Sequence, residues 1–337
     1  MTRTPLRAGL IGLGMMGRHH ARNLRSLDGV ELVAVADPGG DPHGAAPGYD
    51  ILADVQDLIA ARIDYAVVAV PTAFHQDVAL ALAEAGVHCL VEKPLAFDIV
   101  EAETITAAFE AQGLIGGVGY IERYNPALQE MRRRLADGQL GEIFQISTRR
   151  QGAFPARIAD VGVVKDLATH DLDLTAWVAQ SEYEQVAAFS TRRSGRQDED
   201  MVSATGRLRD GTITSHLVNW LSPFKERVTV VTGENGALVA DTVTADLSFH
   251  ANGSSATNVW ESMASFRGVS EGDMVRYSLH RTEPLQVEHA AFRDAVAGGD
   301  PSGIVTMREG LRTVRTVEAV LAAAAEHRVV TLDHQDG

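Results

Sequence analysis

The stretch Gly9–Asp37, GLIGLGMMGRHHARNLRSLDGVELVAVAD, decides the fold of this chain. An apolar run leads into the pattern Gly12-x-Gly14-x-x-Gly17, a helical segment follows, and a second apolar strand ends on an acidic residue. The first glycine suits a tight turn, the second lets backbone amides reach a pyrophosphate, and the third lets the helix pack close to the strand. The anion then lies at a helix N-terminus. The stretch therefore predicts a dinucleotide-binding β-α-β unit.

The acidic residue at the end of this stretch predicts which dinucleotide binds. Asp37 follows Gly17 by about 20 residues, the distance at which a carboxylate accepts hydrogen bonds from the adenosine ribose. No Arg or Lys follows closely to bind a 2′-phosphate, so the pattern favours NAD over NADP. The alternative is a turn residue before Pro38. Met15 and Met16 lie between the second and third glycines and are expected to contact the cofactor as well.

Composition predicts a globular protein with two domains. The chain has 337 residues, of which 45% are hydrophobic, enough for two buried cores. The net charge of −15 argues against nucleic acid as a partner, because phosphates would be repelled. No apolar run approaches the roughly 18 residues that cross a bilayer, and no secretory pattern is present, so we expect a cytoplasmic protein without a membrane partner. The single cysteine, Cys89, excludes an internal disulfide and is expected on a buried strand.

Apolar segments alternate with helical patterns up to about residue 120. Strands are predicted at 65–70, 87–91 and 115–120, and helices at 55–61, 75–85 and 98–112. Short apolar strands separated by helices are typical of a parallel sheet that is buried on both faces. The sequence thus predicts an α/β fold whose N-terminal domain, residues 1–122, is a doubly wound Rossmann sheet.

The pattern changes after residue 122. Strands are predicted at 202–208, 213–220, 228–232 and 236–241, and helices at 126–136, 171–179, 284–297 and 306–326. Asp210-Gly211 supplies a hairpin turn. We infer that residues 123–337 form a substrate-binding and oligomerisation α+β domain on an open-faced, mainly antiparallel sheet with helices on one face. The other face of this sheet must also be covered, and a second subunit is the simplest way to cover it.

The chemistry is expected where the two domains meet, outside the carboxyl ends of the parallel strands. Glu92-Lys93-Pro94 directly follows the predicted strand at 87–91. A lysine in this place can hydrogen-bond a reacting hydroxyl and stabilise its alkoxide character as hydride leaves. Burial would also lower its pKa. The alternative is a surface lysine in a loop that ends at a proline.

A second polar cluster, Asp166-Leu-Ala-Thr-His170-Asp171-Leu-Asp173, leads into a predicted helix. Asp166 and His170 are four positions apart, which puts both on one face if the segment is helical. A neutral imidazole is suited to take a hydroxyl proton, because its pKa is near neutrality. Asp171 and Asp173 have a plainer interpretation as carboxylates favoured by the helix dipole. A metal role for this stretch is an alternative, but hydride transfer with lysine and histidine needs no metal.

These motifs resemble the Gfo/Idh/MocA family, which is named for glucose-fructose oxidoreductase and inositol dehydrogenase. The glycine pattern, Glu92-Lys93-Pro94 and the segment from Asp166 to His170 occur in the family's order and spacing. The resemblance spans nearly the whole chain. It implies an N-terminal Rossmann domain, a C-terminal open-faced antiparallel sheet, and homodimers or homotetramers assembled through that sheet.

The resemblance also implies roles for single residues. Lys93, Asp166 and His170 match the family's catalytic trio, with His170 as general base and Lys93 polarising the carbinol oxygen. Glu92 matches a position near the nicotinamide ribose. Further cofactor contacts are implied for Pro71, Thr72 and His75. For Thr72 a helix-capping role is as natural.

Substrate contacts are expected first from the segment that follows the strand at 115–120. Tyr120-Ile-Glu-Arg123-Tyr-Asn125-Pro126 resembles the family's crossover segment, which brings substrate contacts to the cleft. Arg123 and Asn125 are the stronger candidates within it, against structural roles for both.

A second segment, from Phe154 to Val163, resembles the branch of the family that includes nucleotide-sugar 3-dehydrogenases. Arg157 would bind a phosphate or sugar oxygen there, or pair with Asp160 in a loop. Lys165 stands where an apolar or small residue is expected. A second cation beside the trio would depress the pKa of a neighbouring lysine, bind an anionic substrate group, or point to solvent.

The sequence therefore predicts an NAD-dependent dehydrogenase that oxidises a secondary hydroxyl of a sugar or sugar-like ring to a ketone. C3 of a pyranose, nucleotide-linked or within an aminoglycoside, is the specific expectation. One alternative is an NAD(P)H-dependent keto-sugar reductase or an inositol-type dehydrogenase, which would use the same residues. Another is a non-catalytic dinucleotide-binding sensor, against which the retention of Lys93, Asp166 and His170 speaks.

Overall fold

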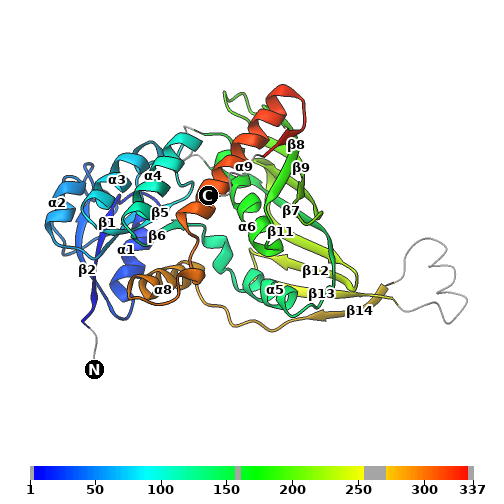
Figure 1. Cartoon of the computed structure of the whole chain (residues 1–337), viewed down its shortest axis with the longest axis horizontal. Coiled ribbons are helices and arrows are strands. Elements are labelled where there is room, and N and C mark those ends of the chain that lie inside the picture. Colours follow the sequence, from blue (N-terminus) through cyan, green and yellow to red (C-terminus); the bar gives the residue numbers. More distant parts are fainter. Residues whose placement is uncertain (1–3, 156–160, 254–270, 333–337) are drawn as a thin grey trace, which may run out of the picture. The chain divides into compact units, whose positions relative to one another are not determined.

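The computed structural model describes residues 4–155, 161–253 and 271–332, and the chain divides into two compact units (Figure 1). Unit 1 comprises Met1–Ile121 and Thr282–Glu318, and unit 2 comprises Glu122–Arg281 and Ala319–Gly337. The change of sequence pattern at residue 122 lies at this division. Residues 282–318, expected in the second domain, pack instead with the first, because their apolar side chains complete its core.

Unit 1 is built on six parallel strands in the order β3-β2-β1-β4-β5-β6. The strands are β1 (Leu6–Ile11), β2 (Val30–Ala36), β3 (Ile51–Leu52), β4 (Tyr65–Val68), β5 (His88–Glu92) and β6 (Gly116–Gly119). The chain moves outward in one direction from β1 to β3 and in the other from β4 to β6. This reversal between β1 and β4 is where doubly wound sheets bind their ligands. The predicted Rossmann sheet is confirmed.

Helices cover both faces of this sheet (Figure 1). They are α1 (Gly17–Ser26), α2 (Val55–Ala60), α3 (His75–Glu84), α4 (Ile99–Ala111), α8 (Pro284–Val296) and the first part of α9 (Met307–Glu326). The side chain of Asp98 accepts a hydrogen bond of 2.9 Å from the backbone N–H of Glu101, so Asp98 caps α4. Asp54 caps α2 in the same way.

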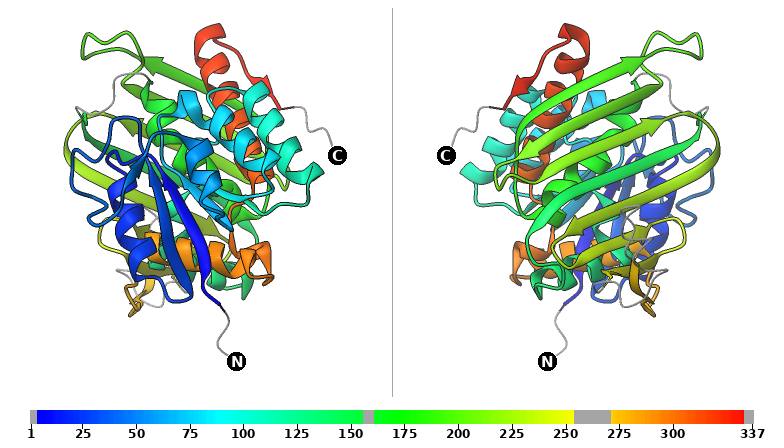
Figure 2. Two further views of the ribbon diagram at one scale, coloured as in Figure 1. Left: turned by 90° about the vertical axis from the view of Figure 1, so that its left-hand side faces the viewer. Right: turned by 90° about the vertical axis from the view of Figure 1, so that its right-hand side faces the viewer.

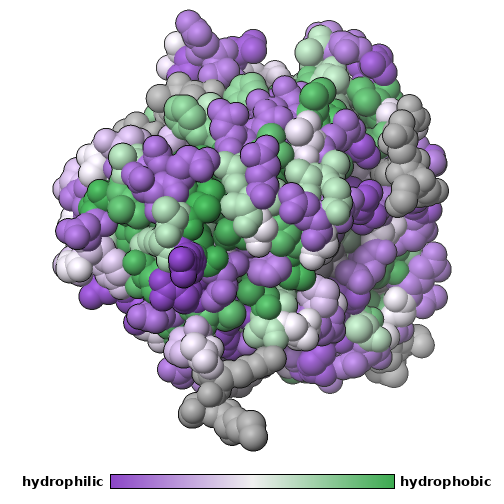
Figure 3. Space-filling view, turned by 60° about the vertical axis from the view of Figure 1, so that its left-hand side comes forward, coloured by the Kyte–Doolittle hydropathy of each residue, from purple (hydrophilic) through white to green (hydrophobic). Residues whose placement is uncertain are grey.

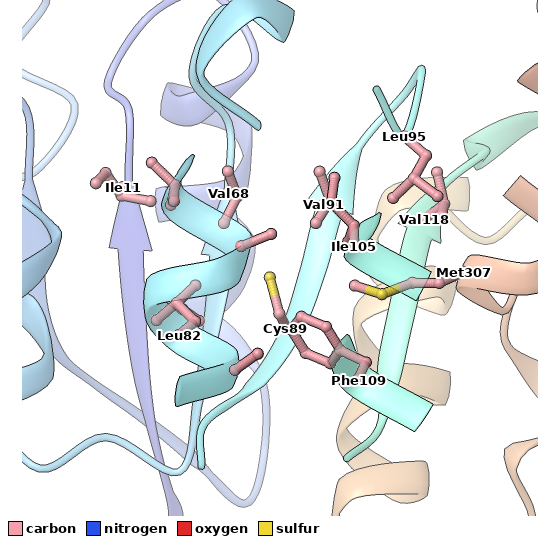
Figure 4. Close-up of a cluster of buried hydrophobic side chains, with 14 of the residues drawn as sticks. Ile11, Val68, Leu82, Cys89, Val91, Leu95, Ile105, Phe109, Val118 and Met307 are labelled. Carbon is pink, nitrogen blue, oxygen red and sulfur yellow. The ribbon is translucent and has the colours of Figure 1, made fainter. Parts of the chain in front are cut away.

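Two apolar clusters hold unit 1 together, one on each face of the sheet. On the face of α3 and α4, Cys89 packs between side chains such as Leu82 and Phe109, with Met307 from the far end of the sequence beside them (Figure 4). Cys89 is fully buried on β5, as predicted, and burial raises the pKa of its thiol. On the other face α1 and α8 pack together. There the rings of Phe292 and Tyr65 pack edge to face, with centroids 5.6 Å apart.

Unit 2 is built on a nine-stranded sheet in the order β14-β13-β12-β11-β7-β10-β9-β8-β15. The strands are β7 (Ile143–Ala153), β8 (Tyr183–Thr191), β9 (Met201–Leu208), β10 (Ile213–Asn219), β11 (Leu221–Gly233), β12 (Gly236–Asp241), β13 (Asp246–Asn252), β14 (Glu271–Arg276) and β15 (Val330–Thr331). Neighbouring strands pair antiparallel except β7 and β10, the parallel pair of the part that the structure describes. The expected mainly antiparallel sheet is confirmed.

Helices α5 (Pro126–Ala136) and α6 (Thr169–Ala179) pack on one face of the second sheet, with a cluster of buried apolar side chains between (Figure 2). Strand residues alternate accordingly: Val202 and Ala204 are buried, whereas Ser203 and Thr205 are exposed. Phe189 is also exposed, at 74%.

Hydrophilic side chains cover much of the molecular face shown in Figure 3, with apolar side chains between them. None of the helices in the described ranges is both long and apolar enough to cross a membrane.

Candidate active site

The glycine loop between β1 and α1 carries the three steric roles that its spacing predicts. Gly12 has φ +96°, and a Cβ there would lie 2.5 Å from the carbonyl oxygen of Ala69. A Cβ on Gly17 would lie 1.9 Å from the carbonyl oxygen of Gly12. A Cβ on Gly14, in contrast, would meet no atom of the described chain within 4 Å. The backbone at Gly14 is therefore open to the approach of a ligand.

Asp37 is fixed beside this loop at the end of β2. Its Oδ2 accepts a hydrogen bond of 2.7 Å from the N–H of Leu13, and its Oδ1 accepts one of 2.7 Å from the N–H of Gly39. The carboxylate therefore holds the glycine loop and forms the turn at the same time. Asp37 is half-buried.

The N-terminus of α1 begins at Gly17 with Met16 as its N-cap, and no side chain caps it. The N–H groups of Arg18 and His19 bond to the carbonyl oxygens of Gly14 and Met16, so this end of the helix favours an anion through the helix dipole. Met15 is 46% exposed beside them. The open glycine, the uncapped helix and the carboxylate of Asp37 together fit a dinucleotide.

The loop after β4 is tied to the turn after β5 by a histidine. His75 is buried, with Nδ1 at 2.9 Å from the carbonyl oxygen of Pro94 and Nε2 at 3.1 Å from that of Val70. Burial lowers the pKa of His75, although these carbonyl oxygens oppose the shift. The first turn of α3 has no side-chain cap, so capping does not account for Thr72, which starts a short 3-10 turn at Thr72–Phe74.

Glu92 and Lys93 stand at the carboxyl end of β5, as predicted. Glu92 is 9% exposed, its Oε1 lies 2.8 Å from His20 Nε2, and its Oε2 accepts a hydrogen bond of 3.1 Å from the N–H of Lys93. Burial acts to raise the pKa of Glu92, but the hydrogen bond from His20 and the charge of Lys93 outweigh it and hold the pKa below its usual value. Glu92 is thus a buried carboxylate. Lys93 is half-buried and joined to Pro94 by a cis peptide bond.

In unit 2, Asp166 and His170 lie on either side of a change in helix type. Val164–Ala168 form a π-helical turn, in which the N–H of Thr169 bonds to the carbonyl oxygen of Val164, and α6 follows at once. Asp166 is buried within the π turn, whereas His170 is half-buried in the first turn of α6. Lys165 is half-buried as well. Single π turns inside helices occur frequently at functional sites.

Asp171 lies in the first turn of α6, where the helix dipole favours a carboxylate, and both Asp171 and Asp173 are also paired inside the protein. Both are 2% exposed. Arg150 of β7 donates to Asp171 at 3.0 Å and to Glu122 at 2.9 Å. Burial acts to lower the pKa of Arg150, but the two carboxylates outweigh it, so Arg150 stays charged. These ion pairs fasten α6, and with it His170, to the sheet of unit 2.

The predicted substrate contacts of the crossover segment lie inside the protein. Arg123 is 6% exposed and forms two hydrogen bonds to the Asp173 carboxylate, at 2.8 and 2.7 Å. Asn125 caps α5 by accepting from the N–H of Ala127 at 3.0 Å. Tyr120 is fully buried in the core of unit 1. Structural roles therefore account for all three side chains, and their contact with substrate stays a prediction. Arg157 and Asp160 lie outside the described residues.

Replacing Arg123 by methionine is expected to lower the free energy of unfolding by about 3–5 kcal/mol, because Asp173 would keep its charge in a buried site. The double variant Arg123→Met/Asp173→Leu should recover most of this loss, since an apolar pair needs no compensation. Urea unfolding of the three proteins measures both effects. Unchanged stability of Arg123→Met together with a raised KM would instead assign Arg123 to the substrate.

Sequence reasoning missed three buried polar residues of unit 1: His20, Glu288 and His289. Their signal was present, because each stands at an apolar position of its helix: His20 beside Ala21 and Leu24, and Glu288 and His289 between Leu285 and Phe292. No group of three or more His, Cys, Asp or Glu side chains suited to a metal ion occurs among the described residues.

Two family models match this chain in tandem. Residues 6–120 match the model described as "Oxidoreductase family, NAD-binding Rossmann fold", and residues 128–239 match the "GFO/IDH/MocA C-terminal domain". The chain belongs to the Gfo/Idh/MocA oxidoreductase family. The resemblance of its three motifs is thereby confirmed, and so is NAD as the cofactor of the Rossmann domain.

Relatives of this Gfo/Idh/MocA protein include sugar and inositol dehydrogenases. It is 30% identical over 217 residues to UDP-N-acetylglucosamine 3-dehydrogenase of Acidithiobacillus ferrooxidans, covering 62% of this chain and 66% of that protein. It is 31% identical over 199 residues to scyllo-inositol 2-dehydrogenase (NAD(+)) of Bacillus subtilis, covering 54% and 56%. The matched segments thus span less than two thirds of these relatives.

Solved structures extend the similarity over nearly the full chain. The Acidithiobacillus ferrooxidans UDP-N-acetylglucosamine 3-dehydrogenase superposes with a TM-score of 0.82 at 25% identity, covering 95% of this chain and 98% of that one. GenD2 from gentamicin A biosynthesis, solved with NAD, also gives 0.82, at 24% identity with 99% and 98% covered. At that identity the second match supports the fold alone.

Proposed function

We propose that this protein is an NAD-dependent dehydrogenase that oxidises a secondary hydroxyl, at C3, of a sugar or sugar-like ring to a ketone. The observation that carries the proposal is the buried, ionised Glu92 directly before Lys93 at the end of β5, next to a glycine loop that fits a dinucleotide. A sensor would need the glycine loop but not a lysine held in this way. NAD, when bound, supplies the hydride acceptor.

Four side chains of the protein carry the remaining roles in this proposal. Lys93 donates a hydrogen bond to the carbinol oxygen and stabilises its alkoxide character. His170 takes the hydroxyl proton, and general base catalysis of this kind contributes on the order of 10² to 10⁴ in rate. Asp166 orients the imidazole of His170. Glu92 binds the nicotinamide ribose and so sets where the hydride is accepted.

The relatives support a cyclic polyol as substrate. UDP-N-acetylglucosamine 3-dehydrogenase supports oxidation at C3 of a nucleotide-linked sugar, with Arg157 and Lys165 as binding residues for anionic groups. The scyllo-inositol 2-dehydrogenase favours the second candidate, an inositol-type substrate. The same residues perform keto-sugar reduction when the proton flow is inverted.

Assembly and location complete the proposal. The exposed face of the unit 2 sheet carries Phe189 and Ile213, which are 74% and 46% exposed. A second copy of the chain would bury such side chains, so we propose a homodimer or homotetramer formed through this face. We place the protein in the cytoplasm, where NAD is available.

A substrate screen tests the proposal. Purified protein with NAD is offered nucleotide-sugars, free sugars, aminoglycosides and inositols, and NADH formation is recorded by absorbance. Turnover of a nucleotide-sugar or free pyranose with a 3-keto product supports the proposed function. Turnover of inositols alone would replace it by the second candidate, and NAD binding without any turnover would favour the sensor.

NAD is expected to stabilise the protein more than NADP does, because Asp37 accepts hydrogen bonds from ribose hydroxyls and repels a 2′-phosphate. A ligand at a hundredfold excess over Kd adds about 2.7 kcal/mol, which a thermal shift resolves. Asp37→Ser should reduce the difference between the two cofactors. Asp41→Ser is the matched control, since Asp41 also holds backbone N–H groups, of Ala45 and Ala46, in the following loop. Equal stabilisation of the wild type by NADP contradicts the role given to Asp37.

A further inference from the structure

Unit 1 encloses a cluster of four ionisable side chains that the proposed chemistry does not use in full. His20 comes from α1, Glu92 from the end of β5, and Glu288 and His289 from α8. Their exposed fractions are 0%, 9%, 1% and 1%. Groups of this kind are rarely buried unless they pair with each other. We call these four residues the histidine–glutamate cluster.

Hydrogen bonds join three members of the cluster in a line. His289 Nε2 lies 2.9 Å from His20 Nδ1, and His20 Nε2 lies 2.8 Å from Glu92 Oε1. The two imidazole rings meet edge to face, with centroids 5.1 Å apart and planes at 75°. The line continues beyond Glu92, because its Oε2 accepts the backbone N–H of Lys93. Both oxygens of Glu92 are thus held.

The direction of these hydrogen bonds follows from the charge of Glu92. An ionised carboxylate only accepts, so His20 donates from Nε2. In a neutral His20 the other nitrogen is then an acceptor, so His289 donates to it from Nε2. Nδ1 of His289 has no hydrogen-bond partner within the described chain, which suits a nitrogen without a proton. Burial lowers the pKa of His289 well below its usual value, which keeps this ring neutral.

Glu288 adds no second charge to the cluster. Neither of its carboxyl oxygens has a partner in the part of the chain that the structure describes. Burial raises the pKa of Glu288 well above its usual value, and the charge of Glu92 raises it further. Glu288 is therefore a neutral acid, and Glu92 carries the single negative charge of the cluster.

The line of hydrogen bonds connects the helix after the glycine loop with the turn after β5. His20 sits one turn into α1, the helix that begins at Gly17 of the glycine loop, and Glu92-Lys93 begin the turn after β5. A charge-assisted hydrogen bond contributes more than a neutral one and fixes the geometry of the carboxylate. Hydrogen bonds in a low-dielectric interior are stronger than in water, so this line of bonds restricts the motion of Glu92.

We propose that His20 and His289 are positioning residues. They act as a two-imidazole relay, in which His289 of α8 donates a hydrogen bond to His20 of α1 and His20 donates one to Glu92. The relay holds the Glu92 carboxylate and the Lys93 backbone in place for the cofactor. The proposal rests on the proposed function in one respect, namely that Glu92 and Lys93 serve bound NAD. The hydrogen bonds of the relay themselves do not depend on NAD.

Two variants of His289 test the relay. Leucine at position 289 removes the N–H that bonds to His20. Glutamine keeps a side-chain N–H that can reach His20 from the same position. His289→Leu is expected to raise the Kd for NAD by about 10- to 100-fold, measured by calorimetry, and to speed hydrogen–deuterium exchange in the peptide that contains Lys93. His289→Gln should restore both to within about threefold of wild type.

His216 provides the matched control for loss of stability. It is another buried histidine with two hydrogen bonds, to Thr148 at 2.8 Å and to Tyr183 at 2.8 Å, but it lies in unit 2. His216→Leu should lower Tm without changing the Kd for NAD or the exchange at Lys93. An equal rise of Kd in His216→Leu and His289→Leu would reduce the effect to general destabilisation and overturn the relay.

Failure of the relay and failure of the proposed function give different results. A wild type that binds no NAD removes the proposed function, while the exchange at Lys93 still reports on the relay. Unchanged exchange at Lys93 in a folded His289→Leu protein overturns the relay, and so does a His289→Gln protein that behaves like the leucine variant. NMR of ¹⁵N-labelled histidine gives an independent readout: both His20 and His289 are expected as Nε2–H tautomers, and a proton on Nδ1 of His20 would refute the direction.

Discussion

Lys93→Met is expected to lower kcat by on the order of 10² to 10³ and to leave the Kd for NAD within about twofold of wild type. The variant keeps an unbranched side chain of similar length at the end of β5 but removes the donor that would face the carbinol oxygen. Loss of one donor to a developing oxyanion has an effect of this size in other enzymes. Steady-state kinetics with the best substrate and calorimetry with NAD measure the two quantities.

The chain offers an unusually clean control for this experiment. It contains three lysines, at positions 93, 165 and 225. Lys225 lies on β11 and is exposed, so Lys225→Met should leave both kcat and the Kd for NAD unchanged. A Lys93→Met protein that binds NAD and turns over substrate as fast as wild type would remove Lys93 from the mechanism.

Alanine at two glycines of the same loop is expected to have different effects on the free energy of unfolding. Gly17→Ala should lower the free energy of unfolding by about 3 kcal/mol, because the new Cβ would lie 1.9 Å from the carbonyl oxygen of Gly12 and the helix would have to move. Gly14→Ala should change stability by less than about 0.5 kcal/mol, because no atom of residues 4–155, 161–253 and 271–332 lies within 4 Å of the new methyl group.

NAD affinity should fall in both variants, but only in Gly17→Ala should stability fall with it. Gly14→Ala fills the space through which the backbone approaches the pyrophosphate, so the Kd for NAD should rise about tenfold or more while Tm stays the same. Gly17→Ala loses NAD binding together with stability. Chemical denaturation and calorimetry on both proteins check this. A Gly14→Ala protein with wild-type affinity would mean that no ligand comes close to the backbone at this glycine.

The sequence predicted the first sheet well because its strands are apolar throughout and its helices begin at recognisable caps. The second strand of the dinucleotide-binding unit ends directly before Asp37, and the helix predicted at 98–112 is α4. In the second sheet, the hairpin from β9 to β10 was predicted from its strict alternation. Local pattern is sufficient wherever one face of an element is apolar and the other is not.

Strand β7 escaped prediction for a physical reason. Its inward positions include Thr148 and Arg150, each 2% exposed, so the alternation of apolar and polar residues is missing. The charge of Arg150 is balanced by Glu122 and Asp171, which are distant in sequence. No local rule shows that a buried arginine will find two carboxylates, and the same holds for the pairing of Arg123 with Asp173.

The motifs predicted where two residues of the candidate site lie in the fold, but not which side chains support them. Lys93 and Asp37 lie at strand ends, where the motifs placed them. That His20 and His289 line up on Glu92 could not be foreseen, because 269 positions separate the two histidines. The glycine spacing also did not reveal that Asp37 would bond to the N–H of Leu13.

The composition of unit 1 from two separate stretches of sequence has a consequence for its biosynthesis. Helix α8 and the start of α9 provide Phe292 and Met307 to its two apolar clusters, yet these residues leave the ribosome long after the six strands have been made. Until then, the nascent sheet presents uncovered apolar surface, and His20 has no imidazole beside it. The complete core of unit 1 therefore forms only after strands β7 to β14 of unit 2 have been synthesised.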